Sequence, residues 1–136
     1  MPWRAEPARL PLAQVSGVTN MQKMFAGSSA FNGDIDGWDV ARVTNMLGMF
    51  HGASSFNRSL TSLDTSSVTS FKQMFLQATS FDQAISFDVR SATTLHQMFR
   101  SATALTAGLT LTHMGGVTDM DRMFQGASSF DQDVSY

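Results

Sequence analysis

The residues best suited to chemistry form a recurring series of acidic side chains that ends in a histidine. Asp39, Asp64 and Asp88 occupy matching positions of an internal repeat, and His113 follows at the next one. If these positions stack as strands in register, neighbouring carboxylates lie about 4.8 Å apart. Like charges at that range repel by about 1 kcal/mol in water, so a compensating partner is needed. Hydrogen bonds to turn amides and a bound calcium ion both satisfy this need, and the sequence leaves the choice between them open.

Asp88 and His113 also suggest a second chemistry, because a carboxylate beside an imidazole is part of a hydrolytic triad. Serines are plentiful around them. The other repeats keep the same scaffold without this histidine, and His51 and His96 occupy freely varying positions expected on the surface. A hydrolase using Asp88 and His113 is therefore a remote alternative. We predict that the chain is not an enzyme, and we assign it no catalytic, cofactor-binding or metal-binding residue.

A methionine also recurs once in each repeat, always followed directly by an aromatic residue. Such a series resembles a ladder of soft thioether ligands for a metal. The neighbouring phenylalanines and the apolar surroundings favour core packing instead, because methionine fills irregular gaps. The methionines are Met24, Met49, Met74, Met98 and Met123, and the phenylalanines are Phe25, Phe50, Phe75, Phe99 and Phe124.

The positions above belong to five copies of one unit, which start at residues 18, 43, 68, 92 and 117. A fixed period of this length indicates a solenoid, in which each unit packs only on its neighbours. We divide the chain into an N-terminal irregular segment or cap, residues 1–17, and a repeat solenoid, residues 18–136. Leu10, Leu12 and Val15 are expected to cover the first unit. The last unit is incomplete, which predicts either a fragment of a longer array or an end that pairs with something else.

Two periodicities occur within a unit. Met21, Met24, Phe25 and Ser28 follow the i, i+3, i+4, i+7 spacing of a short helix. The second half, Ile35–Val40, alternates apolar and polar residues as a short strand does. The expected fold is therefore α/β: a short right-handed repeat solenoid, leucine-rich-repeat-like, of about five units of 24–25 residues, each with a short helix and a short strand.

Composition limits the classes of function. The chain has 136 residues, 43% of them apolar, and a net charge of −2, so no basic field favours nucleic acid. It has no cysteine, which removes disulfides and thiol chemistry but leaves the compartment open. The apolar stretch near the N-terminus is too short and broken for a signal-peptide core or a membrane span, so we expect no membrane insertion.

The repeat itself resembles a known family. The pattern V-T-N-M-x-x-M-F-x-G-A-S-S-F-N, followed by I/L and then W-D-V/T, is similar to the bacterial surface-protein repeat. That repeat occurs in BspA-like leucine-rich-repeat surface proteins and in a domain of unknown function of the mycoplasma lipoprotein type. The fourth unit departs from it most, with Leu105, Thr106 and His113 at otherwise recurrent positions. The resemblance implies a cell-surface or secreted, non-enzymatic protein, with adhesion proposed for some members.

Two function hypotheses follow from this organisation. The first is a structural or recognition segment of a cell-surface or secreted protein that binds a protein or glycan partner through its variable face. The second is an intracellular protein–protein interaction scaffold of the same fold. In either case we expect no nucleic-acid partner, and we expect self-association through the uncapped C-terminal repeat.

Overall fold

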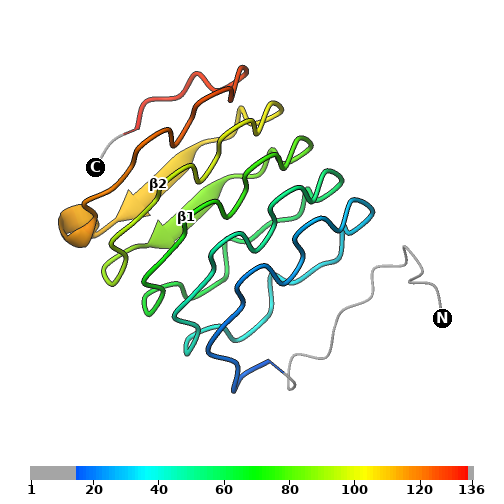
Figure 1. Cartoon of the computed structure of the whole chain (residues 1–136). Helices are drawn as coiled ribbons and strands as arrows, with labels where there is room; N and C mark the ends of the chain where they lie inside the picture. The colour runs from blue at the N-terminus through cyan, green and yellow to red at the C-terminus, as the bar shows by residue number, and fades with distance from the viewer. Residues whose placement is uncertain (1–14, 135–136) are drawn as a thin grey trace.

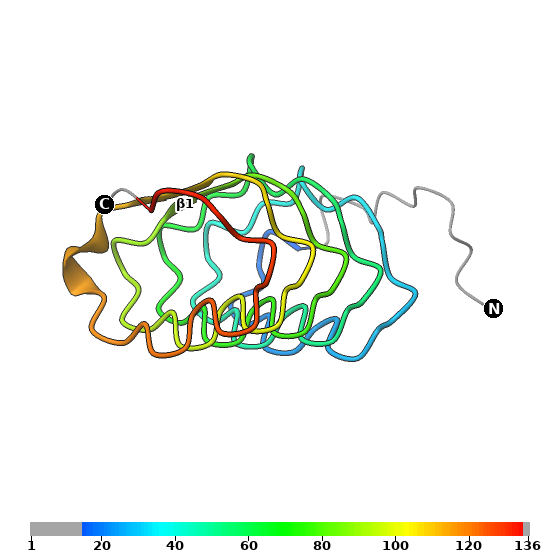
Figure 2. The same ribbon diagram turned by 90° about the horizontal axis from the view of Figure 1, so that it is seen from above.

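The structure, a computed structural model, describes residues 15–134. The chain winds through five stacked coils, which we number by their residues: coil 1 is 18–42, coil 2 is 43–67, coil 3 is 68–91, coil 4 is 92–116 and coil 5 is 117–134. Seen from above, successive coils repeat nearly the same outline (Figure 2). Because equivalent residues lie above one another, a position in the repeat becomes a column along the stack.

Regular elements are few. Strand β1 (Ile85–Asp88) in coil 3 pairs in parallel with strand β2 (Leu109–Thr112) in coil 4, and a 3-10 helix, η2 (Met114–Gly116), follows directly (Figure 1). Isolated parallel bridges join all five coils in one further column, which runs through Asn20, Asn45, Ser70, Thr94 and Asp119. The rest of the described chain consists of turns and loops.

The α/β solenoid of helix–strand units predicted from the sequence is wrong, because residues 15–134 contain no α-helix. Segment 21–28 forms three overlapping turns instead, each closed by a hydrogen bond from an N–H to the carbonyl three residues earlier. Lys23 (φ 54°) and Gly27 (φ 71°) adopt left-handed backbone conformations, which interrupt any helical ladder. Tandem four-residue turns and a short helix share the i, i+3, i+4, i+7 spacing, which explains the error.

The alternate N–H groups of these turns bond to the neighbouring coil. At each of the four junctions, four N–H groups donate to carbonyls of the following coil at 2.7 to 3.2 Å. In each junction a threonine N–H donates in the opposite direction, to the carbonyl of the matching threonine of the preceding coil, and at the last junction the Asp119 N–H also donates to the Thr93 carbonyl at 3.3 Å. The backbone is thus satisfied between coils rather than within a helix, as buried polar groups require. The donors of the first junction are Met21, Lys23, Phe25 and Gly27, and their acceptors are Asn45, Leu47, Met49 and His51.

The predicted strand forms in only part of the stack. In coil 1 the buried residues Ile35 and Trp38 are three positions apart, and a turn bond of 3.0 Å from the Trp38 N–H to the Ile35 carbonyl separates them. In coil 3 the buried pair Ile85 and Phe87 is only two positions apart, so the alternation is continuous and β1 forms. The strand predicted over Ile35–Val40 is therefore absent, because one extra residue converts it into a turn.

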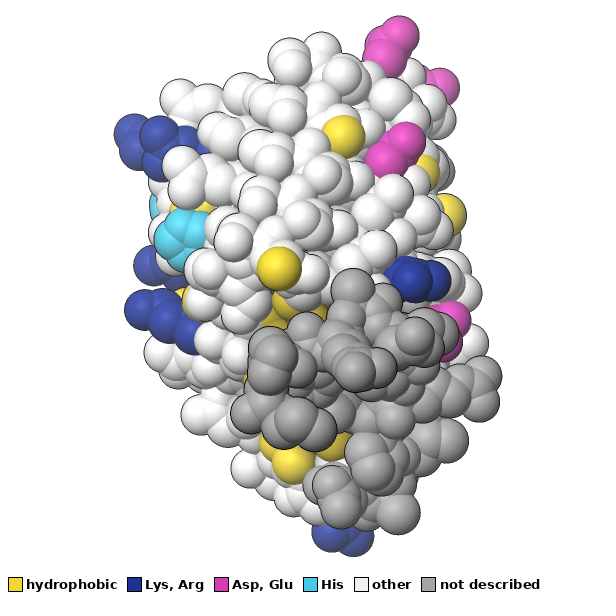
Figure 3. Space-filling view, turned by 90° about the vertical axis from the view of Figure 1, so that its right-hand side faces the viewer, with side chains coloured by type: hydrophobic (Ala, Val, Ile, Leu, Met, Phe, Trp, Pro, Cys, Tyr) yellow, Lys and Arg dark blue, Asp and Glu magenta, His cyan; other side chains and the backbone are white. Residues whose placement is uncertain are grey.

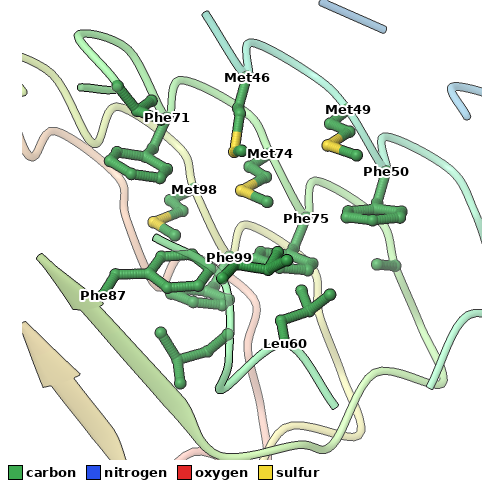
Figure 4. Packing of buried hydrophobic residues seen from close by; sticks show 14 of the residues in the cluster. Met46, Met49, Phe50, Leu60, Phe71, Met74, Phe75, Phe87, Met98 and Phe99 are labelled. Carbon is green, nitrogen blue, oxygen red and sulfur yellow. The ribbon is translucent and has the colours of Figure 1, made fainter. Parts of the chain in front are cut away.

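The core is a set of side-chain columns inside the coils. The rings of Phe50, Phe75 and Phe99 are fully buried and stack nearly parallel, with centroids 5.5 and 5.2 Å apart. Buried methionines line the same interior, among them Met74 and Met98 (Figure 4). The packing interpretation of the methionine series is therefore confirmed for the central coils.

Val15, the first described residue, is buried, and its carbonyl accepts a hydrogen bond from the Val18 N–H at 2.9 Å. Most of the predicted cap, including Leu10 and Leu12, lies outside the described residues. Among residues 15–134 there is no helix of the length and apolarity needed to cross a membrane.

Candidate functional site

The aspartate column lies where each coil turns after its inner strand-like segment. The side-chain oxygen of Asp39 accepts the N–H of the residue two positions on, at 3.2 Å. The same contact measures 3.1 Å at Asp64 and 3.0 Å at Asp88. Ser66 also donates its hydroxyl to Asp64 at 2.6 Å, and these two bonds lower the pKa of the Asp64 carboxyl. Hydrogen bonding to turn amides, the first of the two sequence interpretations, describes the contacts of this column.

Asp88 is the most heavily engaged member of the column. Its carboxylate accepts the Arg90 side chain at 2.8 and 2.6 Å, and His113 Nδ1 lies 3.1 Å from its other oxygen. The side-chain hydrogen bond from Arg90, then its backbone N–H and charge, lower the pKa of Asp88 to about 2. The same contact raises the pKa of Arg90. The cluster is therefore an ion pair with an imidazole beside it.

The paired strands explain how this cluster is positioned. Asp88 is the last residue of β1, and the Thr65 hydroxyl both accepts its N–H and donates to its carbonyl, each at 3.0 Å. The parallel register places Thr112 of β2 opposite Asp88. His113 follows in a left-handed conformation (φ 63°), which turns the chain beside the carboxylate. Asp88 and His113 lie 25 residues apart, which is one coil length, and the two side chains therefore meet between neighbouring coils as predicted.

The contacts around His113 do not extend to a nucleophile among the described residues. The two nearest serines of this column are engaged elsewhere: Ser66 donates to Asp64, and Ser91 donates to the Ser66 carbonyl at 2.6 Å. The His113 side chain is 57% exposed, so water reaches it freely. Among the described residues, the imidazole contacts the Asp88 carboxylate and no serine hydroxyl or oxyanion-binding group.

Metal-binding groups were also considered on the described chain. Residues 15–134 contain no cluster of three or more His, Cys, Asp or Glu side chains arranged to hold an ion. Asp39 lies in the same column as Asp64 and Asp88, and its carboxylate accepts a turn N–H as theirs do. Among the described residues, the fold brings no further calcium ligand to the aspartate column.

A second candidate surface lies on the opposite half of each coil. We call it the turn face; it comprises residues 22–27, 47–52, 72–77, 96–101 and 121–126. Its inward positions carry the constant methionines and phenylalanines, and its outward positions vary from coil to coil. His51 and His96, predicted to be exposed on a variable face, are half-buried here. The residues at the two variable positions are Gln22, Leu47, Lys72, His96 and Asp121, then Ala26, His51, Leu76, Arg100 and Gln125; Leu76 is buried.

Charge is distributed unevenly around the stack. The turn face carries four Lys or Arg residues, Lys23, Lys72, Arg100 and Arg122, and one acid, Asp121. Every other aspartate of the described chain lies elsewhere on the coils. In the view of Figure 3, His and several Lys or Arg side chains lie along the left edge, the Asp or Glu side chains lie toward the right, and further Lys or Arg side chains lie at the right and at the bottom. The turn face therefore has a positive local field on a chain of net charge −2.

Sequence reasoning did not assign a role to one polar column, although its residues were part of the repeat pattern. The Asn32 side-chain oxygen accepts the Asn57 N–H, and the Asn57 side-chain oxygen accepts the Asp82 N–H, both at 2.9 Å. Asp82 continues the column by accepting the Thr106 N–H at 2.7 Å, which lowers the pKa of the Asp82 carboxyl. Recurrence of Asn or Asp directly after a buried phenylalanine was the signal that could have identified it.

A surface hollow lies near this ladder. Two successive coils line it with Asp34, Asp36, Gly37, Arg58, Ser59 and Ser62. The Asp36 carboxylate accepts the Ser62 N–H at 2.8 Å and the Ser59 hydroxyl at 3.2 Å. These bonds fasten one coil to the next, so the polar groups of the hollow serve the stack.

The described chain thus consists of stacked coils with a constant apolar interior and a turn face whose side chains change from coil to coil. Residues 6–112 and 85–136 match the family described as Mycoplasma protein of unknown function, DUF285. The chain belongs to this family. No curated protein matches it, and no solved structure matches it. The predicted resemblance to a mycoplasma family of unknown function is thereby confirmed, and the finer likeness to BspA-like surface proteins stays a prediction.

Proposed function

We propose that the chain is a non-enzymatic recognition segment of a cell-surface or secreted protein, and that it binds an anionic protein or glycan partner through the turn face. The observation that carries this proposal is the separation of constant and variable columns. Within the turns, the repeated Met–Phe pairs point into the core, whereas the outward positions differ in every coil. A constant interior beneath an outward surface that changes from coil to coil is typical of repeat proteins that bind through that surface.

The charges of this face indicate the kind of partner. Lys23, Lys72 and Arg100 belong to three different coils and form no ion pair within residues 15–134. His96 lies 3.6 Å from a carboxylate oxygen of Asp119, so it joins the acidic residues of coil 5 instead. Unpaired cations spread along a rigid surface favour an extended anionic ligand, and this attraction falls as salt rises.

Two further observations support a role without catalysis and a place outside the cell. The imidazole of the Asp88 and His113 pair is open to solvent, and no serine of the described chain contacts it. The repeat pattern also resembles that of bacterial surface proteins, which supports a cell-surface or secreted location. The ion pair of Asp88 with Arg90 gives this corner of the stack a structural role.

A charge-matched pair of variants tests the proposal. Lys23→Gln, Lys72→Gln and Arg100→Gln together remove three cations from the turn face, and Arg42→Gln, Arg58→Gln and Arg90→Gln together remove three from elsewhere. Both triple variants have the same net charge, so only the location differs. Their binding, and that of the unaltered chain, is measured by surface plasmon resonance against heparin, polyglutamate and uncharged dextran.

We expect the unaltered chain to bind heparin or polyglutamate, and not dextran. The turn-face triple variant should bind about tenfold more weakly, which corresponds to about 1.4 kcal/mol, and the control should bind as the unaltered chain does. Heparin binding alone indicates a glycan partner, and polyglutamate binding alone indicates an acidic protein. Equal losses in the two triple variants, or no binding to either anionic polymer, would count against the turn face as the recognition surface.

A further inference from the structure

The two ends of the stack carry complementary backbone groups. At the coil 5 end, the N–H groups of Met120, Arg122, Phe124 and Gly126 have no acceptor among the described residues. We call this the donor end. At the coil 1 end, four carbonyls have no donor among the described residues, and we call this the acceptor end; they belong to Asn20, Gln22, Met24 and Ala26.

These groups occupy the positions that join the coils inside the molecule. At every internal junction, the four equivalent N–H groups of one coil donate to the four equivalent carbonyls of the next, at 2.7 to 3.2 Å. The same bonding pattern therefore occurs four times in succession along the chain. Placing the donor end of one copy on the acceptor end of another creates a fifth junction of the same kind.

The apolar side chains at the donor end and the acceptor end are also complementary to each other. Met24 is 43% exposed and Met120 is 41% exposed, and they are the large hydrophobic residues most open to solvent on the described chain. In the central coils the residues equivalent to both are completely buried. Met21, which occupies the Met120 position in coil 1, is only 1% exposed. Met123, which occupies the Met24 position in coil 5, is only 6% exposed. The Met120 position is thus covered by a following coil, and the Met24 position by a preceding one.

The aromatic columns also stop at the two ends. Phe25 and Phe124 are only partly buried, whereas the three rings between them are fully buried. Each ring of this column stacks on the next with centroids 5.2 to 5.7 Å apart. A junction between the two ends would place Phe124 of one copy over Phe25 of the other and continue the stack.

We propose that the occupant of each end is a second copy of this chain, docked head to tail with its acceptor end on the donor end of its neighbour. Two donor ends cannot pair with each other, because both present N–H groups, and the same holds for two acceptor ends. The contact is therefore heterologous, and each added copy leaves a new free end. The association uses backbone groups and inward side chains of the first and last turns, whereas the proposed recognition function uses the outward cations of the turn face, so the two proposals are tested separately.

The test uses the full chain and one variant for each end. Met120→Glu places a charge on the donor end, and Met24→Glu places one on the acceptor end. Both side chains are exposed in the single copy, so we expect melting temperatures close to that of the unaltered chain. Ser86→Glu, on the exposed side of β1, is the control for an added charge. Sedimentation velocity measures the size of each protein and of their mixtures over a range of concentrations.

We expect the unaltered chain and Ser86→Glu to grow with concentration without reaching a plateau, as an open-ended assembly does. Met120→Glu alone and Met24→Glu alone should remain single copies. Their equimolar mixture should form a two-copy complex and nothing larger, because each supplies the one end that the other retains.

Three results would overturn the proposal. The unaltered chain could remain a single copy at millimolar concentration, Met24→Glu alone could form a symmetric dimer through its intact donor end, or the mixture could stay dissociated while the unaltered chain associates. If a glutamate variant lacks a cooperative melting transition, Met24→Lys and Met120→Lys replace the pair, with the same expected outcomes.

Discussion

Truncating a phenylalanine in the central coil measures how far each coil depends on its two neighbours. Phe75 is completely buried, and its ring lies 5.5 Å from that of Phe50, 5.2 Å from that of Phe99 and 4.3 Å from that of Phe81. Replacing a buried phenylalanine with alanine costs about 3–5 kcal/mol. Because neighbouring coils enclose this ring from both sides, Phe75→Ala should lie in the upper part of that range, at about 4–5 kcal/mol.

The matched control is the equivalent ring in coil 5. Phe124 is only partly buried, and it stacks on Phe99 at 5.7 Å and on Phe130 of its own coil at 4.3 Å. It has a described neighbouring coil on one side only, so Phe124→Ala should cost about half as much, roughly 2 kcal/mol. The two variants remove the same atoms from the same column, which isolates the effect of position.

Urea unfolding at a protein concentration low enough to keep single copies provides the two free energies of unfolding. The transition is followed by far-UV circular dichroism and by tryptophan fluorescence, because coincident curves justify a two-state treatment. Phe75→Leu serves as a conservative reference that should cost about 1 kcal/mol. If Phe75→Ala and Phe124→Ala lose the same free energy to within about 0.5 kcal/mol, the neighbour-by-neighbour account of stability is wrong.

Three smaller perturbations test other parts of the structure. Gly52→Ala should cost about 1 kcal/mol in urea unfolding, because φ is +69° there although space for a methyl group exists. Asn57→Ala should cost about 1–3 kcal/mol by the same assay, because it leaves the Asp82 N–H without its acceptor. Asp88 has a pKa of about 2 in the folded chain against an ordinary 3.8, so its carboxylate stabilises the fold above about pH 4 and this contribution is lost as the pH falls toward 2. Asp88→Asn should therefore be less stable at pH 7 by less than about 1 kcal/mol, and thermal melts should show the difference shrinking in acid.

The buried columns could be predicted because apolar residues recur once per unit. Phe50, Phe75 and Phe99 share one position of the repeat, and all three are fully buried and stacked. Recurrence also placed Asp88 and His113 one coil length apart, and the structure brings them to 3.1 Å. Spacing along the chain therefore carried the information about which residues meet between coils.

The local backbone could not be predicted in the same way. The turns depend on left-handed residues, and Gln73 (φ 58°) and Gln97 (φ 54°) adopt this conformation although glutamine gives no sequence sign of it. Only Gly48 marks that position as one suited to positive φ. The bonds that hold these residues there come from neighbouring coils, so tertiary contacts outweigh local preference. The Arg90 contact to Asp88 was also missed, because it depends on how a long side chain folds back.

The one-way direction of the bonds between coils gives the whole stack an electrical polarity. Within the turns, four N–H groups at each junction point toward the following coil; one threonine N–H points back, joined by that of Asp119 at the last junction. Each peptide group is a dipole with its positive end at the N–H, so the excess adds along the stack as it does along a helix. The partial positive charge therefore accumulates at coil 5 and the partial negative charge at coil 1.

Coil 5 is the part of the stack where acidic side chains gain most from this polarity. It carries four aspartates against a single arginine: Asp119, Asp121, Asp131 and Asp133, with Arg122. Carboxylates near the positive end of aligned peptide dipoles are stabilised, as they are in the first turn of a helix. Coil 1 carries Asp34, Asp36 and Asp39 with Lys23 and Arg42, which is a smaller excess of acidic residues. The stack thus has distinguishable electrical ends, set by a backbone pattern that no single side chain determines.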